Sequence, residues 1–156
     1  TQIAACSKET NPKKAFDNRD YATSFNIWKV HAKQGDADAQ NYIGIHYYLG
    51  LGVDKDYQEA FMWYEKAAKA GNSYAQRNVA DMYNYARGVQ KDTYLAFMWY
   101  FASYSQGNER AKSQVDKIIA LGQLSPNMQL HAKIESNEYI LEKENHFNSY
   151  DTYIEK

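Results

Sequence analysis

The sequence contains little cysteine and little proline, and both shortages limit what the protein can be. A single cysteine, Cys6, cannot form an intrachain disulfide or a thiolate metal cluster. The histidines lack the close spacing of metal sites; they are His31, His46, His131 and His146. We therefore expect neither a metal nor a cofactor. With two prolines and an aromatic share of 15%, the composition argues against disorder and favours helices with many buried or interfacial rings.

An excess of charge of one sign and long apolar runs are also missing. Because 18 basic side chains face 19 acidic ones, no strong field exists for a nucleic acid partner. The sequence contains no run of about 18 apolar residues, which is the length that a helix needs to cross a bilayer. The sequence has no G-x-S-x-G, no glycine-rich phosphate loop and no H-E-x-x-H. These absences predict that the protein is not an enzyme, and the alternative is an enzyme of unrecognised type.

What the sequence does have is an internal repeat with a period of 36 residues. The segment AQNYIGIHYYLGLGVDKD at 39–56 overlays AQRNVADMYNYARGVQKD at 75–92. The segment AFMWYEKAAKAGN at 60–72 likewise overlays AFMWYFASYSQGN at 96–108. A half-unit precedes them and a weaker one follows, so we assign the repeat array to residues 20–124.

Each unit is predicted to form two helices, at 37–49 and 57–70 in the first and at 73–86 and 93–106 in the second. Ala39, Ile43 and Tyr47 share one face at the spacing i, i+4, i+8. The predicted caps are Asp20, Asp36, Asp56, Asn72, Asp92 and Asn108, with Glu59 completing a capping box at Asp56. The predicted terminators are Gly50, Gly52, Gly71, Gly88 and Gly107.

Such a helix pair cannot bury its apolar face alone, so neighbouring units must stack. The shared aromatic residues are assigned to the layer between helices in preference to a ligand cage; they are Phe61, Trp63, Phe97 and Trp99. After the array, Ser125 and Pro126 predict the start of a last amphipathic helix that reaches about residue 145. Its predicted apolar residues are Leu130, Ile134, Ile140 and Leu141. We assign 125–156 to this capping helix and a tail.

The residues that characterise the first unit resemble a known repeat. They are Gly44, Tyr47, Gly50, Gly52, Val53, Lys55, Asp56, Ala60, Trp63, Tyr64, Ala67, Ala68 and Gly71. This pattern resembles the sel-one-like repeat (SLR) family of the tetratricopeptide-like superfamily across 37–108, although Ala80 and Ala86 replace two of the glycines in the second unit. The resemblance implies an all-α fold, a right-handed superhelix (solenoid) of helix-turn-helix repeats with a C-terminal capping helix. It also implies a scaffold that binds another protein.

Residues 3–6 have the form of a bacterial lipobox, in which Ile3 and two alanines precede Cys6. The polar stretch SKETNPKK follows as a tether would, and we assign 1–19 to this leader. Lipidation of Cys6 would place the protein in the periplasm, and Ser7 resembles a signal for sorting to the outer membrane. The alternative is that Cys6 is an ordinary residue of a disordered leader, because no basic and hydrophobic region precedes it in this sequence.

The resemblance implies a more specific role as well. Small bacterial envelope members of the family include immunity proteins, which neutralise toxins that type VI secretion delivers, several of them phospholipases. Our specific hypothesis is a periplasmic immunity protein that binds a lipase-type effector and covers its active site. The alternative is an envelope or signalling adaptor with no toxin partner.

Positions that differ between the units predict where the partner binds. In the superfamily that the sequence resembles, the first helix of each unit lines the concave surface. Its stacking positions recur between units, so the face offset from them is left for recognition. The candidate residues are Asn41, Ile45, Tyr48, Arg77, Asp81 and Asn84, with the non-repeated Tyr85 as an aromatic anchor. The alternative is that these side chains are merely solvated.

Overall fold

The computed structural model describes residues 10–151, with side chains up to residue 139. This part of the chain forms eight α-helices and no strand. They are α1 (Pro12–Asp17), α2 (Tyr21–Lys33), α3 (Ala37–Leu49), α4 (Tyr57–Lys69), α5 (Ser73–Tyr85), α6 (Thr93–Ser105), α7 (Glu109–Ala120) and α8 (Pro126–Asp151). None of them has an apolar stretch long enough to span a bilayer.

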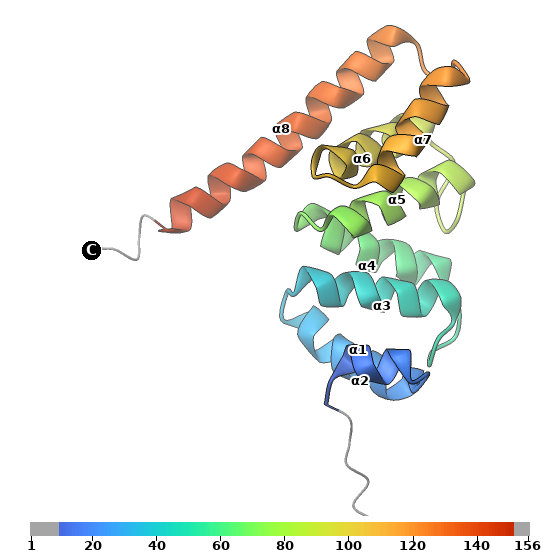
Figure 1. Cartoon of the computed structure of the whole chain (residues 1–156), viewed down its shortest axis with the longest axis vertical. Helices are drawn as coiled ribbons and strands as arrows, with labels where there is room; N and C mark the ends of the chain where they lie inside the picture. Colours follow the sequence, from blue (N-terminus) through green and yellow to red (C-terminus); the bar gives the residue numbers. More distant parts are fainter. Residues whose placement is uncertain (1–9, 152–156) are drawn as a thin grey trace, which may run out of the picture.

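The helices stack one upon another along the long axis of the molecule, with α1 and α2 at one end and α7 near the other (Figure 1). We call the first helix of a unit its A helix and the second its B helix, so that α3 and α5 are A helices and α4 and α6 are B helices. Each A helix packs against the B helix of its own unit and against the B helix before it. This is the all-α solenoid of helix-turn-helix repeats that the sequence predicts.

The predicted N-caps form because a carboxylate or amide oxygen satisfies a backbone N–H that the first helical turn leaves free. Asp36 and Asn72 each accept a hydrogen bond from the backbone three residues on, at 2.9 and 2.8 Å. Asp56 caps α4 in the same way. The capping box with Glu59 does not form, however, because the backbone N–H of Asp56 donates to the carbonyl of Tyr47 (3.0 Å).

Both A helices of the repeated units end in a residue of left-handed conformation. Gly50 has φ 71° and ψ 44°, and Ala86, at the equivalent position, has φ 54° and ψ 45°. The second loop therefore keeps the geometry of the first although an alanine replaces the glycine. The loop is held in place beyond that residue, where Gly88 lies directly against the carbonyl of Tyr57 at the start of α4.

The buried apolar residues fall into two clusters. The first, which we call the N-terminal core, consists of Phe25, Ala32, Ala39 and Ile43 on α2 and α3. The second, the C-terminal core, runs from α4 to α8 and is centred on the aromatic residues of α6. Alanines at the shared positions of the A and B helices are fully buried, which lets the helix backbones approach closely.

The aromatic layer is asymmetric between the units. Phe97 and Trp99 of α6 are buried, as predicted, with 0% and 6% of their surface exposed. Phe61 and Trp63 of α4 also pack against the cores, but they are only partly buried. The ring of Trp63 lies at the edge of the N-terminal core, with Lys66 Nζ 4.5 Å from its centroid. The same residue types in α4 and α6 are thus buried to different extents, because α6 is covered by α8 in addition to the A helices on either side of it.

The segment before α2 contains a packed helix. The side chain of Asn11 caps α1 (3.0 Å to the backbone N of the third residue on), and Ala15 is fully buried. The ring of Phe16 meets that of His46 edge-on at 5.5 Å. The expectation of a polar leader up to residue 19 is therefore wrong for α1, because Ala15 and Phe16 give this helix an apolar side.

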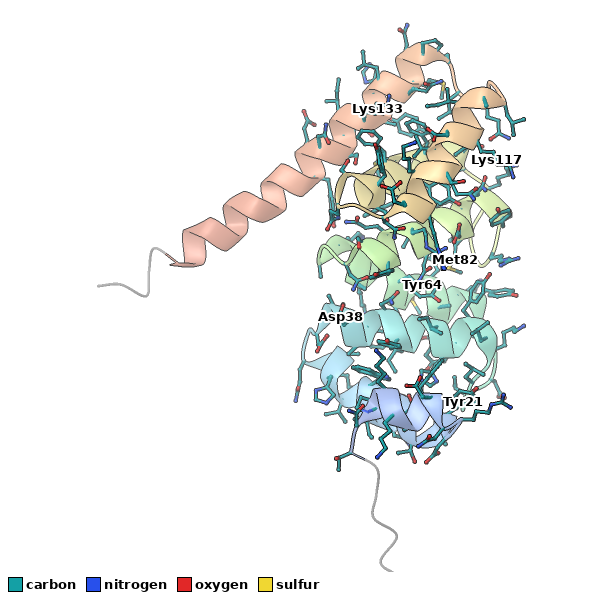
Figure 2. The ribbon with its side chains drawn as sticks, viewed as in Figure 1. Tyr21, Asp38, Tyr64, Met82, Lys117 and Lys133 are labelled. Atoms are coloured by element: carbon teal, nitrogen blue, oxygen red, sulfur yellow. The ribbon has the colours of Figure 1, made fainter. Side chains whose placement is uncertain are left out.

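The helix α8 begins where the sequence predicts, and the hydroxyl of Ser125 caps it (3.3 Å to the backbone N of Met128). It continues to Asp151, beyond the predicted end. It packs against α6 and runs diagonally away from the stack (Figure 1). Lys133 of α8 lies over the ring of Phe101 at 5.6 Å (Figure 2).

The face of α8 that packs on α6 differs from the predicted one. Leu130 and Ile134 are 58% and 45% exposed, so their assignment to the packed face is wrong. Ala132 and Ser136 are buried in their place, and Tyr139 of the same helix packs against Trp99 of α6. The other two predicted positions, Ile140 and Leu141, lie outside the described side chains.

Candidate partner-binding groove

A groove of about 560 Å³ lies between the two A helices α3 and α5, with Tyr64 of α4 in its lining. Figure 2 shows Asp38 and Tyr64 near the middle of the stack. The groove, which we call the α3–α5 groove, is lined by Asp38, Asn41, Tyr42, Ile45, Tyr48, Leu49, Tyr64, Asn72, Tyr74, Arg77 and Asn78. A second hollow of about 470 Å³ follows between α5 and the start of α7. Tyr74 and Arg77 line both, so the two hollows are neighbours along the row of A helices.

The structure brings most of the candidate residues together. Four of them line the α3–α5 groove: Asn41, Ile45, Tyr48 and Arg77. Asp81 lines an adjoining hollow of about 240 Å³ that shares Tyr48 and Arg77 with the groove. Asn84 and Tyr85 line none of these hollows; Asn84 contacts the hydroxyl of Tyr100, and Tyr85 is exposed at the end of α5.

A chain of hydrogen bonds crosses the floor of the groove. The hydroxyl of Tyr100 donates to Asp81 Oδ1 (2.6 Å), and Arg77 Nη1 donates to Asp81 Oδ2 (2.9 Å). Arg77 Nη2 donates to Asn78 Oδ1 (2.9 Å), and Asn78 Nδ2 donates to Asn41 Oδ1 (3.0 Å). The chain links α6, α5 and α3, so it fixes the register of the units and the shape of the groove.

This network changes the interpretation of three candidates. Asn41 is 8% exposed and its carbonyl oxygen is occupied by Asn78, so it supports the groove and offers little surface to a partner. Arg77 and Asp81 are each about a quarter exposed and neutralise one another in an ion pair. The i, i+4 spacing of Arg77 and Asp81 within α5 is visible in the sequence, whereas the contact of Asn78 with Asn41 joins two units and depends on how they stack.

Burial sets the protonation of the groove floor. It raises the pKa of the Tyr100 phenol well above its ordinary value, and the charge of Asp81 adds to the effect. Burial raises the pKa of Tyr64 strongly as well. The pKa of Asp81 is also raised by burial, while the hydrogen bond from Tyr100 and the charge of Arg77 oppose that rise. Both phenols therefore stay protonated at neutral pH, and that of Tyr100 donates its proton to the hydrogen bond with Asp81.

Comparison with known proteins identifies the repeat. The model of the Sel1 repeat matches residues 37–72 and 73–108. The two matched segments adjoin and together span residues 37–108, the two complete units of the array. No curated protein matches the sequence.

Two solved structures resemble the Sel1 solenoid described above. One is a protective antigen of uropathogenic Escherichia coli strains that displays an SLR fold, with a TM-score of 0.75 and 26% identity over 83% of this chain and 28% of that one. The other is a Sel1 repeat protein from Oxalobacter formigenes, with a TM-score of 0.69 and 24% identity over 85% of this chain and 58% of that one. The chain spans less than two thirds of the length of either relative.

The α3–α5 groove also contains exposed residues that were not predicted from the sequence. Tyr74 is 65% exposed and Leu49 is 51% exposed, and both line the α3–α5 groove. The sequence did contain an indication for Tyr74. Its counterpart in the first unit is Asp38, and a position that differs between units is the kind that we assigned to recognition. Leu49 gave a similar signal, since its counterpart in the second unit is Tyr85.

Two chemical predictions concern groups beyond the groove. Among the described residues, no group of three or more His, Cys, Asp or Glu side chains is placed to hold a metal ion. Cys6, the predicted lipidation site, lies outside the described residues, so its modification stays a prediction.

Proposed function

We propose that this Sel1-repeat protein captures a partner protein in the α3–α5 groove. The observation that carries the proposal is the pairing of a hydrogen-bonded polar floor with exposed apolar side chains at the rim. Tyr74 and Leu49 stand in solvent while the floor beneath them is already ordered. A partner therefore gains apolar burial without reorganising the groove, which is the arrangement that concentrates binding energy in a few residues.

We propose further that the partner is a toxin and that the chain is a periplasmic immunity protein. In this role it binds a phospholipase-type effector of type VI secretion and covers its active site. Two features support the idea. The repeats resemble the SLR family, whose small bacterial envelope members include immunity proteins, and residues 3–6 have the form of a lipobox, which suits attachment to the outer membrane.

The partner is identified by capture from the native envelope followed by mass spectrometry, with groove variants as the test. Tyr48 and Arg77 are poor positions for this purpose: Tyr48 packs against Tyr57 at 5.2 Å, and Arg77→Glu would place a second carboxylate beside Asp81. Leu49→Ala with Tyr74→Ala removes exposed groups instead. We expect this double variant to lose about 2 kcal/mol or more of binding free energy at an unchanged melting temperature.

The matched control is Val30→Ala with Met62→Ala, which truncates exposed apolar side chains on α2 and α4, outside the hollows described above. It should capture the partner as the wild type does. Equal capture by the groove variant and the wild type would show that the partner binds another surface. A captured protein with no toxic activity against the envelope would favour the adaptor role over immunity.

The envelope location is tested separately with the full-length precursor in a Gram-negative host. We expect Cys6 to incorporate a fatty-acid analogue and Cys6→Ser to release the protein from the membrane fraction. A wild type that is unlabelled and wholly in the soluble fraction contradicts the periplasmic anchoring, and with it much of the immunity proposal.

A further inference from the structure

Two cations lie over a group of tyrosine rings at the end of the α3–α5 groove. The rings of Tyr48 and Tyr57 are 5.2 Å apart, and Lys55 Nζ is 5.7 Å from the centroid of Tyr57. The guanidinium carbon of Arg87 is 5.4 Å from the centroids of both Tyr48 and Tyr85. We call these five residues the basic aromatic cluster. Since Tyr48 also lines the groove, the cluster continues the groove surface.

Neither cation of the cluster forms an ion pair with a side chain of the part that the structure describes. The ion pairs formed by the described side chains are Lys69–Glu65, Arg77–Asp81 and Lys112–Asp116. Lys55 and Arg87 take part in none of these and are exposed. Of the acidic residues next to Lys55 in the chain, Asp56 is occupied as the cap of α4, and Asp54 is exposed.

The rings hold the cations in place but leave their N–H groups free. A guanidinium that lies over an aromatic face keeps its edge available, and that edge matches the two oxygens of a carboxylate. Because Arg87 lies over two rings, it loses less conformational freedom on binding than a solvated arginine would. The cluster is therefore organised in advance for a carboxylate ligand.

We propose that the basic aromatic cluster receives an acidic segment of the partner protein. Carboxylates of Asp or Glu side chains pair with Arg87 and Lys55, while neighbouring side chains of the segment pack on the tyrosine rings. The proposal rests on the proposed function, because it assumes that the partner lies in the α3–α5 groove. Two cations on a chain of net charge −1 suit a short acidic peptide better than a nucleic acid, whose binding needs many phosphate contacts.

The test begins with a phage library of random 12-residue peptides, selected on the immobilised full chain. We expect the selected peptides to be rich in Asp and Glu. A selected peptide is then synthesised twice, once as found and once with its acidic residues changed to the amides, and both are measured by fluorescence anisotropy. The wild type should bind the amide peptide about tenfold more weakly, because a charge-assisted hydrogen bond is lost.

The variant Lys55→Gln with Arg87→Gln should bind the acidic peptide about tenfold more weakly and no longer discriminate between the two peptides. The matched control is Lys29→Gln with Lys66→Gln, which removes two cations that also lie over rings, those of Phe25 and Trp63. It should retain the discrimination. Equal melting temperatures of the two variants show that neither result comes from unfolding.

The outcomes separate this proposal from the proposed function. If the selected peptides bind the wild type, lose affinity for Tyr74→Ala and are not enriched in Asp and Glu, the proposal of an acidic segment is wrong. The proposal that the partner binds in the α3–α5 groove is then retained. Peptides that ignore Tyr74→Ala, or a library without binders, overturn both. Labelled dodecathymidylate that binds wild type more tightly than the acidic peptides would identify the cluster as a nucleic acid site and overturn the proposal.

Discussion

At the scale of single residues, His46 is a buried ionisable group whose two ring nitrogens are both occupied. Its Nδ1 lies 2.6 Å from the carbonyl of Leu51, which can only accept, so Nδ1 carries the proton. Its Nε2 then accepts from the hydroxyl of Ser24 at 3.2 Å. The neutral ring thus links α2, α3 and the loop after α3, and burial lowers its pKa below the ordinary 6.5.

The lowered pKa of His46 predicts that acid weakens the fold. The unfolded chain binds the proton more readily than the folded one, so stability is full above pH 6.5 and falls as the pH drops through the folded pKa. The pKa of Asp81 is raised in the folded chain, so protonation of this carboxylate at lower pH favours the folded state and opposes the effect of His46. Urea unfolding between pH 7.5 and 5 measures the loss.

The variant His46→Gln tests whether this residue is responsible. It should lower stability at pH 7 by about 1–3 kcal/mol, since buried polar partners lose their hydrogen bonds. It should also flatten the pH dependence between pH 7 and 5. A variant with the same slope as the wild type would assign the effect to another group.

At the scale of the element, the B helices show how one sequence motif gives two degrees of burial. Trp99 is packed in the C-terminal core and meets Tyr139 of α8 at 5.2 Å. Trp63 is partly exposed. We expect Trp99→Ala to cost about 3–5 kcal/mol and Trp63→Ala about half of that, because only the first leaves an enclosed cavity. Thermal melting ranks the two, and equal losses would contradict the asymmetry.

The loops between the helices of a unit make a second prediction at this scale. A Cβ added at Gly88 would clash with the carbonyl oxygen of Tyr57, so Gly88→Ala must push the loop away from α4. We expect a loss of about 2 kcal/mol or more. Gly107→Ala is the control: it also has positive φ, 87°, but no atom within 4 Å, so it pays only the backbone cost of about 1 kcal/mol.

The helices and their ends could be predicted from the sequence because both depend on neighbours in the chain. Asp36 and Asn72 cap α3 and α5 through their own first turn. The packed face of α8 could not be predicted, since it depends on which helix α8 meets. Leu130 and Ile134 suit a packed face by hydropathy, but Ala132 and Ser136 are buried instead.

At the scale of the whole molecule, the two cores are stacked and not merged. Phe25 belongs to the N-terminal core and Phe97 to the C-terminal core, and Tyr47 packs against both. In such an array stability comes from each unit and its nearest neighbours. The two ends of the chain can therefore open separately.

Hydrogen exchange of two core variants measures this independence. Phe25→Ala should reduce the protection of amides in α2 and α3 and leave α5 to α7 nearly unchanged, and Phe97→Ala should have the strongest effect on α5 to α7. Each substitution should cost about 3–5 kcal/mol locally. A uniform loss along the chain in both variants would show that the solenoid opens as one unit.

The groove could be predicted only in outline. The sequence places Asn41, Ile45 and Tyr48 on one face of α3 because helical spacing is local. Which side chains stay free depends on partners from other units, and Asn41 is occupied by Asn78 across the groove. The same holds for the basic aromatic cluster, whose members come from α3, α4, α5 and two loops.

The packing of α8 against α6 decides where the array can be lengthened by design. The junctions at 71–72 and 107–108 are alike: each has a glycine of positive φ followed by an asparagine that caps the next A helix. A unit inserted at the first junction would pack against the B helix α4 on one side and the A helix α5 on the other, which are the neighbours that a unit of the array needs. A unit appended after α7 would have to displace α8. Internal duplication is thus the route to longer arrays, and the number of inserted units would set the length of peptide that one engineered molecule can hold.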